Sequence, residues 1–135
     1  MSPIAVGVNL LWCVPGDVGG SEQYLVRQLL GLASQRAEFV PTLYCLPSFV
    51  DAHPELRELY PMVVAGISGD ERPRRILAEH VWLRRRTAGA ELMHHGGGTA
   101  PAGGRGPVVL TIHDLQYLTH PEFLSSTKLR YLQWS

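Results

Sequence analysis

A glycine-rich segment between an apolar run and an amphipathic helix constrains the fold of this chain more than any other feature. The run Ile4–Leu10 predicts a buried strand, and the segment from Ser21 to about Gln35 predicts a helix. Between them, Gly16–Glu22 has the composition of an anion-binding loop, because glycines admit close backbone approach and a helix N-terminus offers unpaired N–H groups. The segment indicates a phosphorylated ligand or a binding edge of the sheet; the alternative is a tight turn that needs positive φ. The residues expected on the apolar side of the helix are Leu25, Val26, Leu29, Leu30, Leu32 and Ala33.

The spacing of these glycines differs from the two best-known phosphate motifs. Gly16-Asp17-Val18-Gly19-Gly20 does not match the Gly-x-Gly-x-x-Gly fingerprint of dinucleotide-binding folds, and it lacks the Gly-Lys-Ser/Thr ending of a P-loop. A nicotinamide or ATP site is therefore disfavoured. Because the carboxylate of Asp17 would oppose a phosphate, we expect it to face solvent or a sugar hydroxyl.

Apolar runs alternate with helical patterns along the rest of the chain, which predicts an α/β fold with a parallel sheet and helices on both faces. Pro47–Tyr60 indicates loop and short helix, and Gly96–Gly106 indicates a flexible loop. The run Val108–Ile112 is apolar throughout, as expected of a strand that is covered on both faces. The other predicted elements are strands at Val40–Leu46, Met62–Ala65 and Glu91–His95, and helices from Pro73 to about Arg86 and from Pro121 onward.

In such a sheet the ligand lies beyond the carboxyl ends of the strands. This rule places Gly16–Glu22, His94–Gly98 and His113–Asp114 on one rim. A histidine at the end of a strand can donate a hydrogen bond to a substrate oxygen, so His113 is a candidate catalytic residue. Asp114 would orient it or cap the following turn. The alternative is a buried histidine that a backbone carbonyl satisfies.

Several histidines raise the question of a metal site. His94 and His95 are neighbours on a predicted strand and point to opposite faces, so a regular strand cannot offer both to one ion. No His-x-His or Cys-x-x-Cys pair is present, and a catalytic metal is disfavoured. The corresponding alternative enzyme is a metal-dependent hydrolase that uses His94, His113 and His120.

Size and composition predict one soluble domain in the cytoplasm. The 135 residues are 45% apolar, and twelve basic side chains balance twelve acidic ones, so no overall field attracts nucleic acid. Met1-Ser2-Pro3 leads directly into the first strand without a basic leader region, and no apolar run is long enough to span a bilayer. Cys13 and Cys45 are expected to be reduced, half-buried thiols.

Arginines gather around the helix predicted from Pro73. On a regular helix Arg74, Arg75, Arg85 and Arg86 fall near one side, which usually means a solvated face. The alternative is a basic patch for peripheral contact with anionic lipid at the inner face of a membrane. Residues Ile76, Leu77, Val81 and Leu83 are expected to pack inward. The full arginine group is Arg72, Arg74, Arg75, Arg84, Arg85 and Arg86.

Two segments together resemble retaining glycosyltransferases of family 4. They are Gly19–Leu25 and Val109–Tyr117, which lie about ninety residues apart, and His120–Phe123 and Lys128–Tyr131 continue the likeness. The resemblance runs from Ile4 to Ser135 and covers the first part of that family's N-terminal domain. It implies a Rossmann-like domain of a GT-B fold, in which the N-terminal domain binds the acceptor and a C-terminal domain binds the nucleotide sugar.

The resemblance also implies roles for individual residues. Gly19 and Gly20, with Ser21 and Glu22, would approach the donor diphosphate, and His113, supported by Asp114, would contact the transferring sugar. The family works without a metal or other cofactor. Because the chain ends within a helical pattern and the donor domain is absent, we expect an incomplete N-terminal domain that is inactive alone. The alternative is a non-catalytic α/β module that binds a phosphorylated ligand.

Overall fold

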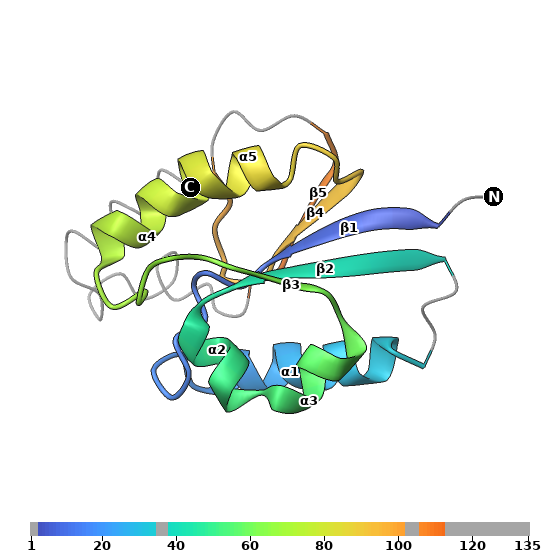
Figure 1. Ribbon diagram of the computed structural model, residues 1–135, viewed down its shortest axis with the longest axis horizontal. Helices are drawn as coiled ribbons and strands as arrows, with labels where there is room; N and C mark the ends of the chain where they lie inside the picture. Colours follow the sequence, from blue (N-terminus) through green and yellow to red (C-terminus); the bar gives the residue numbers. More distant parts are fainter. Residues whose placement is uncertain (1–2, 35–37, 102–105, 113–135) are drawn as a thin grey trace.

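Five parallel strands form the centre of the computed structural model, which describes residues 3–34, 38–101 and 106–112 (Figure 1). The order is β3-β2-β1-β4-β5, and each neighbouring pair runs parallel. The predicted α/β, Rossmann-like fold class is confirmed. The strands are β1 (Ile4–Asn9), β2 (Phe39–Cys45), β3 (Met62–Val64), β4 (Leu92–His95) and β5 (Val108–Leu110).

Helices cover both faces of this sheet (Figure 1). One face carries α1 (Gly20–Leu32), α2 (Pro47–Ala52) and α3 (Pro54–Leu59), and the other carries α4 (Arg72–Ala78), the π-helical η1 (Glu79–Leu83) and α5 (Arg84–Arg86). A proline occupies the first turn of α2, α3 and α4, where its missing N–H costs nothing. The predicted loop and short helix at Pro47–Tyr60 are thus two short helices.

Alternate residues of β2 supply both halves of the core. Leu43 and Cys45 belong to the cluster that includes Leu25 and Leu29 of α1, whereas Tyr44 belongs to the opposite cluster. This division follows from the two-residue period of a strand, which sends neighbouring side chains to opposite faces. The helix α1 buries Leu25, Val26 and Leu29 as predicted, but Leu30, also predicted to face the core, is exposed.

The helix that follows β3 departs from the regular period. Leu77 is 63% exposed and Val81 is 42% exposed, so the prediction that they pack inward is wrong. The π-helical turn accounts for Val81, because its wider i→i+5 bonding rotates residues within and after it relative to a 3.6-residue helix. Leu77 lies in α4, before this turn, so the turn does not account for its exposure. Glu79 and Leu83 are the buried residues of this turn.

The strand β5 corrects a second expectation. Its three residues are all exposed, although the sequence predicted a strand covered on both faces. The reason is its position: β5 pairs with β4 and ends the row of five strands that the structure describes. Within the same described residues, no helix combines the length and apolar character needed to cross a membrane.

Cys13 and Cys45 are free thiols in the core, more deeply placed than the half-buried positions expected of them. Burial is the main reason that the pKa of Cys13 rises to about 12, with smaller contributions from the charges of Glu22 and Cys45. Burial likewise raises the pKa of Cys45 to about 11. Both thiols are therefore protonated, and neither is an activated nucleophile.

Candidate functional site

The order in which strands are added to the sheet reverses between β1 and β4. The chain builds β2 and β3 outward from β1 and then returns to place β4 on the other side of β1. Ligands of open α/β sheets bind beyond the carboxyl ends of the strands at such a switch point. Here those ends are Asn9 of β1 and His95 of β4, which are register partners.

One of the three segments predicted to share a rim, His94–Gly98, lies here against residues that flank Gly16–Glu22 on either side. A Cβ added to Gly97 would lie 2.5 Å from Cγ of Trp12, in the segment that leaves β1. A Cβ added to Gly96 would lie 3.2 Å from Cδ2 of Leu25, in α1. Because Gly96 and Gly97 carry no Cβ, the segment that follows β4 can pack directly against Trp12 and Leu25. The third segment, His113–Asp114, lies outside the described residues.

The glycine loop has the backbone of a strained turn and an open outer side. Gly16 has φ +86°, and Gly19, the N-cap of α1, has φ +62° and ψ −137°, a combination that only glycine adopts readily. Gly19 and Gly20 are exposed, and an added Cβ at either would meet nothing within 4 Å. Asp17 is exposed, as expected. The turn therefore needs glycine at Gly16 and Gly19 for conformation, and no described residue occupies the space beside Gly19 and Gly20.

Glu22 lies beneath this loop with its carboxylate inside the protein. Its Oε1 accepts a hydrogen bond from the Gly16 N–H over 3.0 Å, and its Oε2 lies 2.5 Å from Nε2 of His53. Glu22 is therefore placed to hold the loop from within. Sequence reasoning missed His53, which comes from the junction of α2 and α3, 31 residues away. No spacing rule joins the two residues.

A second polar group stands at the switch point itself. Nδ2 of Asn9 lies 3.0 Å from Nδ1 of His95, and Oδ1 of Asn9 accepts the N–H of Leu11 over 3.1 Å. The amide nitrogen can only donate, so Nδ1 of His95 accepts and the proton of the neutral ring is on Nε2. Burial, followed by the charge of His94, lowers the pKa of His95 to about 4. His95 is consequently neutral near pH 7.

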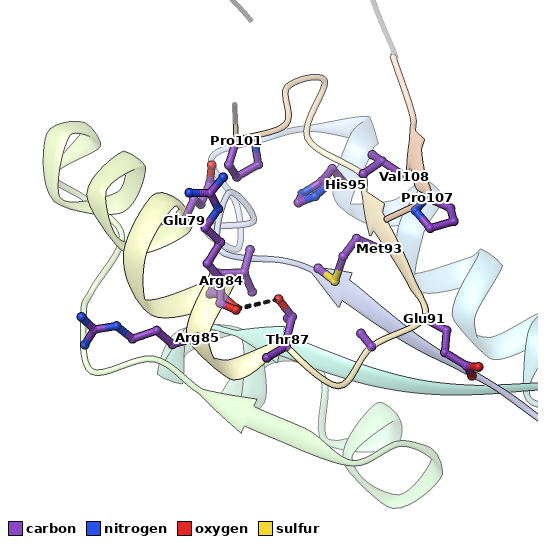
Figure 2. A pocket seen from close by; sticks show the side chains of 13 residues that line it. Glu79, Arg84, Arg85, Thr87, Glu91, Met93, His95, Pro101, Pro107 and Val108 are labelled. Atoms are coloured by element: carbon purple, nitrogen blue, oxygen red, sulfur yellow. Dashed lines mark hydrogen bonds between the residues drawn. The ribbon is translucent and has the colours of Figure 1, made fainter. Parts of the chain in front are cut away.

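His95 also borders a cavity of about 600 Å³ between the η1–α5 helix and the strands β4 and β5 (Figure 2). Figure 2 shows His95 and Met93 directed into the cavity, whereas Arg85 and Glu91 point away from it. Glu79 lines it from the π-helical turn. Burial raises the pKa of Glu79, and Arg75, a hydrogen bond with Asn9 and His80 lower it in part. Asn9 thus interacts with His95 and Glu79, two of the polar residues that line the cavity.

A hollow of about 510 Å³ follows the carboxyl ends of β1, β2 and β3. Two carboxylates and two hydroxyls line it, together with Val14 and Pro15 of the segment before the glycine loop. Such groups can exchange hydrogen bonds with a ligand that carries hydroxyls. The four polar residues are Ser48, Asp51, Ser68 and Asp70.

The histidine pair has no common target. Nε2 of His94 lies 2.8 Å from Oγ1 of Thr111, while His95 bonds Asn9, so the two rings have separate partners. Within residues 3–34, 38–101 and 106–112, no group of three or more His, Cys, Asp or Glu side chains could hold a metal ion. His120, from the alternative metal set, lies outside these ranges.

The arginine group has mixed surroundings. Nε of Arg74 lies 3.0 Å from Glu71, and the Arg86 guanidinium lies 5.9 Å from the ring centre of Trp82. Arg84 and Arg85 are exposed. Arg72 and Arg75 are half-buried. Contact of this group with anionic lipid stays a prediction.

Comparison with known proteins supplies no relative for this chain: no family model, no curated protein and no solved structure matches it.

Proposed function

We propose that this chain is the acceptor-side part of a retaining glycosyltransferase that uses a nucleotide sugar. The observation that carries the proposal is the position of the Gly16–Gly20 loop. It follows β1 at the switch point of a parallel sheet and leads into α1, with open space beside Gly19 and Gly20. The fold class and this loop match what the resemblance to family 4 implies for an N-terminal domain.

In the proposed reaction the loop serves the donor diphosphate. The Gly19 and Gly20 backbone and the Ser21 side chain would face the phosphate oxygens, and the positive end of the α1 dipole would favour the charge that develops on the leaving diphosphate. By the resemblance, His113 would contact the transferring sugar and Asp114 would orient it. This electrostatic stabilisation requires no metal.

The acceptor in this proposal is a molecule that carries a reactive hydroxyl. The hollow lined by Ser48, Asp51, Ser68 and Asp70 supports this class, because it begins beside the glycine loop and offers groups that bind hydroxyls. The oxygen of the acceptor would form the new glycosidic bond to the anomeric carbon, and the nucleoside diphosphate would leave. The proton of the hydroxyl would pass to a base of the complete site.

The test is sugar transfer by the protein that carries this chain, isolated from its own cells and characterised by intact mass. Radiolabelled nucleotide sugars would be offered as a panel with mixed cell-extract acceptors. We expect one donor to label an acceptor, with His113→Ala cutting kcat far more than it changes the melting temperature. Binding of a nucleoside diphosphate without transfer to any acceptor would instead favour the non-catalytic binding module.

A further inference from the structure

We propose that His53 is the positioning residue of the glycine loop and acts on it through the Glu22 carboxylate. The inference rests on the proposed function for the identity of the ligand, a diphosphate, but its geometry concerns only residues of the chain. Nε2 of His53 lies 2.5 Å from Oε2 of Glu22, and Oε1 of the same carboxylate accepts the Gly16 N–H over 3.0 Å. One carboxylate therefore connects the α2–α3 junction to the first glycine of the loop.

His53 is itself held in place from two sides. Its ring lies 4.8 Å from the ring of the fully buried Phe49, tilted by 48°. It ends α2 and precedes Pro54, the first residue of α3, so its backbone is fixed between two helices. Because the ring of His53 is held by its neighbours, it keeps the Glu22 carboxylate, and through it the Gly16 N–H, in a fixed position.

The charges around the pair favour a rigid contact. Oε2 of Glu22 lies 2.5 Å from Nε2 of His53, whereas Oε1 of the exposed Glu55 lies 3.4 Å from Nδ1, so Glu22 is the closer partner of the ring. Cys13, in the connection between β1 and α1, lies near Glu22, and its raised pKa keeps it uncharged. A buried carboxylate requires such compensation, since removing one partner leaves the other charge unpaired in the interior.

The consequence for the ligand is preorganisation. Gly16 has a φ of +86°, a conformation in which glycine is free to move. The hydrogen bond from its N–H to Glu22 fixes the peptide at this position and therefore the course of the loop that follows. Because Glu22 belongs to α1, its bond to the Gly16 N–H holds the loop against the start of that helix, where Gly19 is the N-cap and Gly20 the first residue. A diphosphate would then bind without the cost of ordering the loop.

The experiment compares His53→Ala, His53→Gln and the control Glu55→Gln in the ¹⁵N-labelled protein. Two quantities are measured: hydrogen exchange of the Gly16 amide and affinity for inorganic pyrophosphate. We expect His53→Ala to accelerate that exchange and weaken binding by about tenfold each, as loss of a charge-assisted hydrogen bond would. His53→Gln, whose amide can still donate to Glu22, should recover most of both losses. Glu55→Gln should leave both nearly unchanged, because Glu55 is largely exposed and its contact is long.

Unchanged Gly16 exchange in a folded His53→Ala protein would overturn the inference. If His53→Ala does not fold, His53→Asn replaces it, because the shorter amide cannot reach Glu22 from the same backbone; unchanged exchange there would be equally decisive. Failure of the wild-type protein to bind pyrophosphate would count against the diphosphate role of the loop. The exchange comparison would still decide the role of His53.

Discussion

The side-chain amide of Asn9 donates to Nδ1 of His95 over 3.0 Å and joins the ends of two neighbouring strands that are 86 residues apart in the chain. The carbonyl oxygen of Asn9 also accepts the indole N–H of Trp12, and its side-chain oxygen accepts the N–H of Leu11. One residue thus organises the first turn after β1 and the contact with β4. This arrangement requires a His95 ring that is unprotonated at Nδ1.

The stability of the fold should therefore fall as pH decreases from about 6.5 to about 4. Burial lowers the pKa of His95 from 6.5 to about 4, so in this window the unfolded chain binds a proton that the folded chain does not. The loss of folding free energy is absent above pH 6.5 and reaches at most a few kcal/mol near pH 4, on the order of 1.4 kcal/mol per unit of pKa shift. Urea unfolding at stepped pH should show a shallower slope for His95→Gln than for the wild type.

Glu79 supplies the control for that experiment, because its effect has the opposite sign. Its pKa is raised from 4.5, so ionisation as pH rises above 4.5 costs folding free energy. Glu79→Gln should remove this cost and steepen the dependence that His95 produces. Identical pH slopes in the wild type and both variants would contradict the assignment of the dependence to this pair.

Substitution of Gly19 should measure the cost of the backbone conformation of the loop without any contribution from a steric clash. Gly19→Ala places a side chain at φ +62° and ψ −137°, at a cost of roughly 1 to 3 kcal/mol, although nothing lies within 4 Å of the added carbon. Gly20→Ala is the matched control, because Gly20 begins α1, has no positive φ and has the same open space. Denaturant unfolding should place Gly20→Ala at or slightly above the wild type. Equal destabilisation by both changes would show that the cost has another origin.

A clash should dominate at Gly97. The Cβ of Gly97→Ala would lie 2.5 Å from Cγ of Trp12, a ring atom that cannot move independently, so we expect a loss of about 1 to 3 kcal/mol. Gly89→Ala is the control, since Gly89 has neither a positive φ nor an atom within 4 Å of the added carbon. Calorimetric melting of the two variants measures the difference. A Gly97→Ala protein as stable as Gly89→Ala would mean that the two segments do not meet as described.

The two thiols should be unreactive until the protein unfolds. With pKa values of about 12 and about 11 and no exposed surface, Cys13 and Cys45 offer little thiolate at mildly alkaline pH. Mass spectrometry after iodoacetamide treatment should find neither labelled in the native protein and both labelled in guanidinium. Rapid labelling of Cys13 in the native state would contradict its placement in the core.

Local pattern predicted most of the fold because its elements are regular. The runs that became β1 and β2 are mostly apolar, β4 is ended by three glycines, and α1 repeats its buried residues at helical spacing. The errors occurred where the backbone departs from those periods or from full burial. The π-helical turn at Glu79–Leu83 changed the side on which Val81 lies, and no propensity rule signals such a turn.

The candidate site was predictable only as far as its backbone. The glycines at positions 16 and 19 indicate an unusual turn, because glycine adopts positive φ without steric cost, and both residues have positive φ in the structure. The side chains that complete the site come from distant segments: His53, from the α2–α3 junction, bonds Glu22, and His95, from β4, bonds Asn9. Their partners depend on the register of the sheet and on helix packing, which a single sequence does not contain.

The position of β1 between β2 and β4 also affects the order in which the sheet can form during synthesis on the ribosome. Asn9 has its β2 partner, Tyr44, early, but His95 follows it by 86 residues, roughly 4 to 17 seconds of synthesis at about 5 to 20 residues per second. Protease treatment of ribosome-bound chains that stop before and after His95 would reveal a protected β1–α1–β2 unit in both. Once β2 is in place and until β4 follows, the edge of β1 that β4 later covers is unpaired. Until the ribosome completes β4, nascent β1 thus has only β2 beside it and α1 packed on its face.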